Sequence, residues 1–221
     1  MSELSPLDPP DFAILRIEYM LHSLSEEDVL ENPVEQFVRW LNQAIEAEAH
    51  EPNAMMLATA TPEGIPSARM VLLKGVDETG FVFFTNYLSQ KGHELEQNPR
   101  ASLLFYWPEL ERQVRVDGAV SKTTRAESVQ YFESRPTAAR LGSAASPQSQ
   151  PVASRQALES LQKALLEQYP NGHVPCPEHW GGYRLRPHRL ELWQGRPSRL
   201  HDRVEYLIQA DGKWARRRLA P

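Results

Sequence analysis

Short apolar runs separated by turn residues dominate the middle of the chain. The runs are rich in Val, Leu, Phe and Thr, and they lie at 54–60, 65–75, 81–86, 101–107 and 111–120. Gly, Pro and charged residues separate them, as in the stretches TPEG and VDETG. Runs of this length with such turns predict antiparallel strands joined as a meander. A β-barrel or sandwich therefore fits the pattern better than a doubly wound parallel sheet.

The alternation of apolar and polar residues returns near the C-terminus. It predicts strands at 181–187, 189–195 and 198–209, and the hairpin turn ADGK leads to a last strand at 214–220. The chain is therefore expected to be mainly β with flanking helices, an α+β architecture.

An amphipathic helix precedes the strands. Residues 33–48 carry the i, i+3, i+4 spacing of a core-facing stripe, which consists of Phe37, Trp40, Leu41, Ala44 and Ile45. Asn32 is a good N-cap, and Pro33 suits the first helical position. A weaker pattern predicts an earlier helix over 11–23.

Three further helices are expected between the strands. They cover 89–99, 124–136 and 154–170, with Ser89, Thr124 and Ser154 as N-caps and a capping box between Thr124 and Glu127. In the second of them Tyr131 and Arg135 are four residues apart, so they should share a face. The stretch 142–154 is small, polar and proline-containing, and its composition predicts a flexible linker.

Charge is unevenly distributed along the 221 residues. Residues 1–51 hold 2 basic and 12 acidic residues, whereas residues 181–221 hold 10 basic and 4 acidic ones. This distribution suggests an anionic ligand near the C-terminal third. The net charge of −5 argues against binding of bulk nucleic acid, for which the whole domain should be basic.

Length and composition indicate one domain over 11–221, preceded by an acidic, proline-rich and disordered tail at 1–10. No apolar run is long enough to cross a bilayer, and the N-terminus does not resemble a signal peptide. Cys176 is the only cysteine, so an intrachain disulfide is impossible and a cytoplasmic location is expected. His173 and His179 near Cys176 lack the spacing of a zinc site, and no metal is expected.

Three stretches could carry chemistry. In RMVLLKG, Arg69 and Lys74 fall on opposite faces of a regular strand, so a shared anion requires a bulge or a strand end. In FTNYLSQKG a strand leads to a helix N-terminus, where free amide groups favour phosphate. In SRLHDR an extended strand would place Arg199, His201 and Arg203 on one face, unless this is an edge strand that charge protects from aggregation.

These stretches occur in a fixed order with several others: RMVLLKG, GFVFFTNYLSQKG, ASLLFYWPELERQVRVDG, YFESRP, SPQSQP, HWGGYRLRP, LWQGRPSRLHDR and RRLAP. From about residue 16 to the C-terminus the chain resembles the pyridoxine/pyridoxamine 5′-phosphate oxidase family. The resemblance implies a split β-barrel and a homodimer with FMN at the subunit interface. It also implies oxidation of pyridoxamine or pyridoxine 5′-phosphate to pyridoxal 5′-phosphate, by hydride transfer from substrate C4′ to flavin N5. O2 would be the acceptor and H2O2 a product, with ammonia released from the amine.

The resemblance implies a set of FMN-binding residues. They are Arg69, Met70, Val71, Leu72, Leu73, Lys74, Phe84, Thr85, Gln90, Lys91, Gln113, Gln148, Ser149, Trp193 and Arg203. On this basis the SPQSQP loop binds flavin, against the linker expected from composition.

A second set is implied for the substrate. It consists of Arg16, Tyr19, Lys74, Tyr131, Arg135, Ala139, Arg199, Leu200 and His201. Arg199 and His201 are the expected catalytic pair: an arginine stays protonated and orients the substrate, and the histidine can assist proton movement. Residues 11–31 would form a lid-like segment, and 181–221 would complete the site.

Three positions depart from the family pattern. Gln90 stands where an arginine is common, and the loss of one charge-assisted bond to phosphate could cost about 1–3 kcal/mol of flavin binding. Ala139 stands where a serine usually helps to hold the substrate phosphate, and Ala144 replaces a common tryptophan. We expect these departures to change cofactor affinity and KM more than the reaction class.

Two alternatives stay open. A flavin- or deazaflavin-dependent reductase would keep the barrel and change the reaction, although the intact set of substrate residues argues against it. A non-catalytic module could instead bind pyridoxal phosphate, or single-stranded nucleic acid on Tyr, Trp and Arg side chains.

Overall fold

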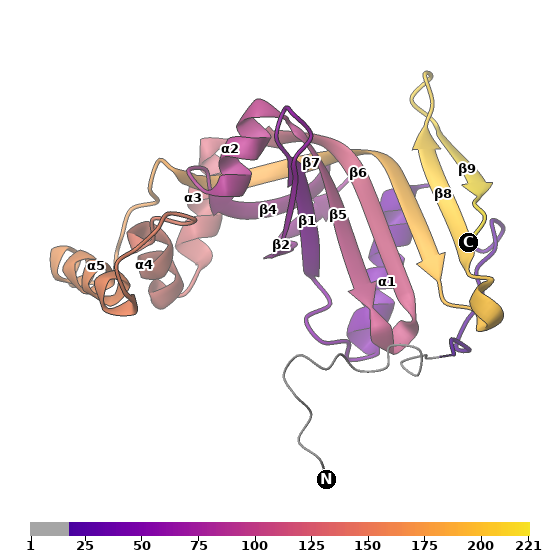
Figure 1. Ribbon diagram of the computed structural model, residues 1–221, viewed down its shortest axis with the longest axis horizontal. Helices are drawn as coiled ribbons and strands as arrows, with labels where there is room; N and C mark the ends of the chain where they lie inside the picture. Colours follow the sequence, from indigo (N-terminus) through magenta and orange to yellow (C-terminus); the bar gives the residue numbers. More distant parts are fainter. Residues whose placement is uncertain (1–17) are drawn as a thin grey trace, which may run out of the picture.

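Residues 18–221 are described in this computed structural model, and their apolar runs pair into one curled antiparallel sheet (Figure 1). The strands are β1 (Ala54–Ala60), β2 (Pro66–Leu72), β3 (Gly75–Asp77), β4 (Gly80–Asn86), β5 (Arg100–Trp107), β6 (Arg112–Lys122), β7 (Trp180–Gln194), β8 (Asp202–Ile208) and β9 (Trp214–Arg218). Their order is β2-β1-β5-β6-β7-β4-β3, with β8 paired to β7 and β9 paired to β8. The predicted mainly β architecture with flanking helices is confirmed.

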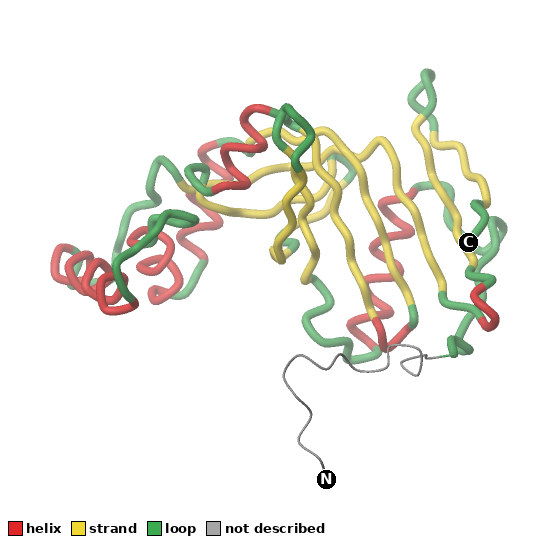
Figure 2. Tube along the Cα trace, viewed as in Figure 1, coloured by secondary structure: helices red, strands yellow, loops and turns green. Residues whose placement is uncertain are grey.

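The helices, apart from α4, begin where the capping residues predict, and α4 was not expected from the sequence. They are α1 (Pro33–Glu46), α2 (Gln90–Gln97), α3 (Arg125–Ser134), α4 (Thr137–Ala145) and α5 (Arg155–Gln168), with short 3-10 turns η2 (Pro108–Leu110) and η3 (Pro197–Arg199). The side chains of Asn32, Ser89, Thr124 and Ser154 all cap the helices that follow them. Figure 2 shows α4 and α5 at one end of the molecule, beyond the sheet. Within residues 18–221 no helix has the length and apolar content that a membrane span needs.

Several predicted elements differ in the structure. The 65–75 run divides into β2 and β3, and 181–195 is one strand, in which Pro187 lies opposite Gly118 and the unpaired His188 forms a bulge of β7. The predicted 142–154 linker is wrong at its start, because α4 continues to Ala145. The predicted helix over 11–23 lies partly outside the described residues, and its remainder, 18–23, is not helical.

The core lies between α1 and the sheet. Phe37 of α1 is fully buried, and its ring centroid lies 4.9 Å from that of Phe81 and 4.7 Å from that of Phe105. Trp40 and Trp107 extend this aromatic cluster, which holds α1 on one face of the sheet.

Substitution of Phe37 by alanine tests this packing. We expect Phe37→Ala to lower the free energy of unfolding by about 3–5 kcal/mol, because it removes a fully buried ring and leaves a cavity. Urea denaturation followed by circular dichroism measures the change. The prediction that Ile45 belongs to the core-facing stripe is wrong, because its side chain is 54% exposed, and Ile45→Ala is therefore the matched control. An equal loss in both variants would contradict the assignment of Phe37 to the core.

Candidate functional site

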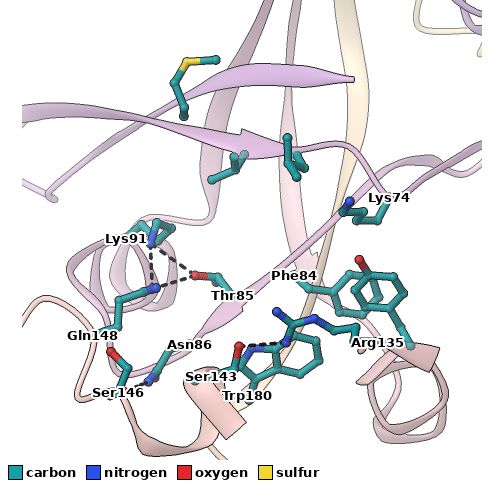
Figure 3. Close-up of a pocket in the computed structure, with 15 residues that line it drawn as sticks. Lys74, Phe84, Thr85, Asn86, Lys91, Arg135, Ser143, Ser146, Gln148 and Trp180 are labelled. Atoms are coloured by element: carbon teal, nitrogen blue, oxygen red, sulfur yellow. Dashed lines mark hydrogen bonds between the residues drawn. The ribbon is translucent and has the colours of Figure 1, made fainter. Parts of the chain in front are cut away.

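A cavity of about 410 Å³ opens between β2, β4, α2 and α4 (Figure 3). It is called the α2–α4 pocket below. Its lining residues are Met70, Val71, Leu72, Lys74, Phe84, Thr85, Asn86, Lys91, Tyr131, Arg135, Gly142, Ser143, Ser146, Gln148 and Trp180. The pocket carries a lysine at one end and an arginine at the other.

Lys91 forms the polar end of the pocket. Its Nζ lies 3.2 Å from Thr85 Oγ1 and 3.0 Å from Gln148 Oε1 (Figure 3). Burial, and then the positive charge of Arg69, lowers the pKa of Lys91 to about 8. Within the described chain Lys91 forms no ion pair with a carboxylate. A buried cation surrounded by neutral donors and acceptors fits a phosphate group, which would supply the missing negative charge.

Arg69 lies behind this end and not in the pocket lining. Its guanidinium pairs with Glu94 of α2, with Nη2 3.2 Å from Oε2. Burial raises the pKa of Glu94, but this effect is outweighed by hydrogen bonds from Ser67, Thr59 and Gln90 and by the charge of Arg69. The net result is a pKa lowered to about 2. Gln90 also turns toward Glu94, with its Nε2 2.9 Å from Oε1. Lys74 follows the end of β2 and does line the pocket, whereas Arg69 does not, so the structure does not bring the two cations to one anion.

The other end of the pocket is aromatic and cationic. The Phe84 ring stacks on Tyr131 at 4.0 Å and on Trp180 at 5.5 Å. The Arg135 guanidinium lies 5.0 Å from the Trp180 ring centroid, and its Nη1 donates to Ser143 Oγ at 2.8 Å. Burial lowers the pKa of Arg135. Arg135 caps α3 in an extended conformation, so it reaches the pocket beside Tyr131 without sharing a helical face with it.

A second group of predicted residues lies at the far end of β7. Gln113, Trp193 and Arg203 are direct cross-strand neighbours on β6, β7 and β8. The Tyr19 ring centroid lies 5.6 Å from that of Trp193 and 5.7 Å from that of His201. These five residues are called the β8 cluster below. Arg203 contacts Glu191 through Nε and Nη2, at 2.8 Å in both cases.

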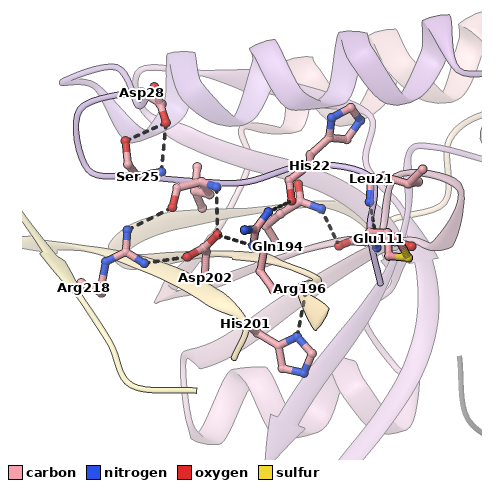
Figure 4. Close-up of polar contacts among 12 residues, drawn as sticks. Leu21, His22, Ser25, Asp28, Glu111, Gln194, Arg196, His201, Asp202 and Arg218 are labelled. Atoms are coloured by element: carbon pink, nitrogen blue, oxygen red, sulfur yellow. Dashed lines mark hydrogen bonds and ion pairs between the residues drawn. The ribbon is translucent and has the colours of Figure 1, made fainter. Parts of the chain in front are cut away.

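The predicted strand face that carries Arg199, His201 and Arg203 is wrong. β8 begins at Asp202, and Ser198 and Arg199 have positive φ angles of 57° and 62° in the turn before it. Arg199 and Leu200 are consequently exposed rather than aligned with Arg203. The backbone N–H of Arg196 donates to His201 Nδ1 at 3.1 Å, which leaves Nε2 of the neutral ring as the donor (Figure 4). Burial, and then the charge of Arg199, lowers the pKa of His201.

The two groups are far apart within one chain. Trp180 lines the α2–α4 pocket at the start of β7, and Trp193 lies thirteen residues later on the same strand. At about 3.3 Å per residue this is about 40 Å of strand. Figure 1 shows β7 running from the α3 side of the molecule toward β8.

Most predicted site residues therefore fall into one of two groups. Seven are outside both, namely Arg69, Leu73, Gln90, Ala139, Ser149, Arg199 and Leu200, and Arg16 lies outside the described residues. The prediction missed Asn86, Gly142, Ser143, Ser146 and Trp180 as pocket residues. Ser143 lies one helical turn after Ala139 on α4, a spacing that could not be used at the level of sequence because no helix was predicted there. No group of three or more His, Cys, Asp or Glu side chains in 18–221 is placed to hold a metal.

Comparisons with known proteins agree along most of the chain. The family described as pyridoxamine 5′-phosphate oxidase matches residues 41–163, and the pyridoxine 5′-phosphate oxidase C-terminal dimerisation region matches 180–221. The chain is 54% identical over 209 residues to a pyridoxine/pyridoxamine 5′-phosphate oxidase of Trichormus variabilis, covering 95% of this chain and 98% of that protein. It is 57% identical to the one from Paraburkholderia phymatum, with the same coverage.

Solved structures share the fold. PhzG from Burkholderia lata, in complex with tetrahydrophenazine-1-carboxylic acid, has a TM-score of 0.85 and 32% identity, covering 91% of this chain and 99% of its own. A pyridoxamine 5′-phosphate oxidase-related, FMN binding protein from Nostoc punctiforme has a TM-score of 0.68 at 20% identity and covers 86% and 98%.

Proposed function

The chain belongs to the pyridoxine/pyridoxamine 5′-phosphate oxidase family of oxidoreductases. On that premise we propose that it uses FMN to oxidise pyridoxine 5′-phosphate and pyridoxamine 5′-phosphate to pyridoxal 5′-phosphate. When the substrate is the amine, pyridoxamine 5′-phosphate reacts with O2 and water to give pyridoxal 5′-phosphate, ammonia and H2O2. The observation that carries the proposal is the α2–α4 pocket, where two separate cationic ends flank a stacked aromatic wall. This arrangement suits two planar phosphate monoesters.

The residues at the polar end fit the phosphate of FMN. Lys91 is 8% exposed, and Thr85 and Gln148 lie within hydrogen-bond distance of it. Met70, Val71 and Leu72 provide a partly apolar edge for a ring system. When bound, FMN would supply what the side chains lack, an acceptor for the substrate hydride and a route for its electrons to O2.

Lys74, Tyr131 and Arg135 would hold the substrate phosphate at the other end. The stacking of Phe84, Tyr131 and Trp180 fixes the position of the Tyr131 ring. Trp180 does the same for the guanidinium of Arg135. Rigid donors of this kind reduce the entropy cost of orienting the substrate.

A second copy of the chain would complete the site with its β8 cluster. The cluster is about 40 Å of strand away from the pocket in its own chain, so a ligand in the pocket can contact a β8 cluster only from a partner. Met70 is 65% exposed and Tyr106 51% exposed, as expected for apolar side chains that a partner covers. His201 would then donate from Nε2 to the substrate, and Arg199, which stays protonated, would orient it.

A visible spectrum of the purified protein, recorded anaerobically before and after pyridoxamine 5′-phosphate, tests the proposed function. A flavin band that bleaches with substrate and returns with air is expected. A flavin band that this substrate leaves unchanged would contradict the reaction and keep the cofactor, and the absence of flavin after addition of FMN would contradict both.

Ser143 is expected to contribute to substrate binding. Its oxygen accepts from Arg135, so its own O–H can donate to a bound phosphate. We expect Ser143→Ala to raise the KM for pyridoxamine 5′-phosphate about two- to tenfold with little change in kcat, the effect of one hydrogen bond. Steady-state kinetics measure it, with the exposed Ser134→Ala as control. An unchanged KM would show that Arg135 needs no help from the hydroxyl.

A further inference from the structure

The segment that carries Tyr19 is held by side-chain carboxylates (Figure 4). The backbone N–H groups of Met20 and Leu21 donate to Glu111 Oε2 at 2.9 and 3.1 Å. Three residues later, the N–H of Leu24 donates to Asp202 Oδ2 at 3.1 Å. The N–H groups of this segment therefore donate to carboxylates and not to carbonyls of a helix. This explains why the helix predicted from the sequence is absent over 18–23.

Glu111 is itself rigidly placed. It adopts a left-handed conformation with φ of 53° between η2 and β6, and it is 9% exposed. Its backbone carbonyl accepts from the N–H of Gly195, just after β7. One residue therefore joins the N-terminal segment, the turn before β6 and the end of β7.

This attachment fixes the position of the neighbouring Tyr19. Its ring packs against Trp193 and His201, and a Cβ at Gly195 would lie 2.6 Å from Tyr19 Cγ. Only glycine at 195 leaves room for the ring. The Tyr19 ring therefore has one well-defined site, bounded by Gly195 and by two members of the β8 cluster.

Asp202 supplies a second attachment through Leu24. It also pairs with Arg218 at 2.7 Å and with Arg196 at 3.4 Å. Arg196 in turn donates from Nη1 to the carbonyl of His22 at 3.0 Å. These contacts hold the segment beyond Leu21, whereas the two bonds to Glu111 are the ones next to Tyr19.

We propose that Glu111 is a positioning residue for substrate binding, which acts by holding Tyr19 in place within the β8 cluster. The proposal rests on the proposed function, in which the β8 cluster of one subunit contacts the substrate bound in the pocket of its partner. The carboxylate contributes through two accepted hydrogen bonds, so an acceptor of the same shape should largely replace it. The chemical step itself does not involve Glu111.

The test compares Glu111→Ala, Glu111→Gln and Tyr19→Ala in the holoenzyme. For Glu111→Ala we expect the KM for pyridoxamine 5′-phosphate to rise about tenfold or more and kcat to change less than about threefold. Glu111→Gln keeps one carbonyl oxygen and should stay within about threefold of wild type in KM. In the Tyr19→Ala background, Glu111→Ala should add little, because both changes act on one contact. Glu109→Ala removes a carboxylate from the same turn and is the matched control.

Amide hydrogen exchange provides a readout that is independent of turnover. In Glu111→Ala the amides of Met20 and Leu21 should exchange about tenfold faster or more, while those of β6 and β7 stay protected. Faster exchange with an unchanged KM, additive effects with Tyr19→Ala, or unchanged exchange would each overturn the proposal. A wild-type holoenzyme that does not oxidise pyridoxamine 5′-phosphate would overturn the proposed function, and with it the role in substrate binding, while the exchange measurement still reports on the attachment.

Discussion

Mixing Arg135→Ala protein with His201→Ala protein is expected to restore activity that neither variant has alone. Arg135 belongs to the α2–α4 pocket and His201 to the β8 cluster, at opposite ends of β7. If each site combines the pocket of one subunit with the β8 cluster of its partner, a mixed dimer contains one intact site and one site with both defects. Each variant alone should lose at least about 30-fold in kcat/KM, because removal of one partner of a desolvated charge contact costs about 2–5 kcal/mol.

The expected recovery is about one quarter of wild-type activity. Random exchange of subunits makes half of the dimers mixed, and each mixed dimer has one working site of two. The measurement is turnover after the two proteins are mixed, unfolded in urea and refolded together. Arg135→Ala with Lys74→Ala is the control, because both residues line the same pocket and no intact site can form. Equal activity in the two mixtures would contradict a shared site.

Substitution of Lys91 is expected to weaken FMN binding about 10- to 100-fold, because it removes the charge-assisted contact at the buried end of the pocket. Methionine is a suitable replacement because it keeps the length and volume of the side chain. Titration of FMN fluorescence with apoprotein measures Kd. Lys163→Met on α5 is the control, since that side chain is 79% exposed.

The same lysine predicts how FMN affinity depends on pH. Lys91 has a pKa of about 8, so without ligand its side chain is charged below that pH and becomes neutral above it. Affinity for the phosphate dianion should therefore be fully present near pH 7 and fall by up to about tenfold per pH unit above 8. Lys91→Met should remove this dependence. A fall of the same size in the variant would assign the pH dependence to another group.

Sequence-based reasoning was most accurate where the determining interactions are local. The caps at Asn32, Ser89, Thr124 and Ser154 and most of the strand runs were identified correctly, because capping depends on neighbouring residues and strand faces on a period of two. The family resemblance predicted that Lys91, Thr85 and Gln148 bind the same ligand, and the structure places them within hydrogen-bond distance of one another. Composition alone would have left Gln148 in a linker.

Only the tertiary structure decided the rest. Arg199 leaves the expected strand face because Pro197 and two left-handed residues form a turn there, which alternation cannot reveal. Residues 18–24 are not helical because carboxylates distant in sequence, Glu111 and Asp202, accept their N–H groups. The division of the site follows from the length of β7, which separates Trp180 from Trp193. The sequence by itself thus determined the strands, the caps and the chemical types at the site, because these depend on near neighbours. Long-range pairing decided which of those residues meet.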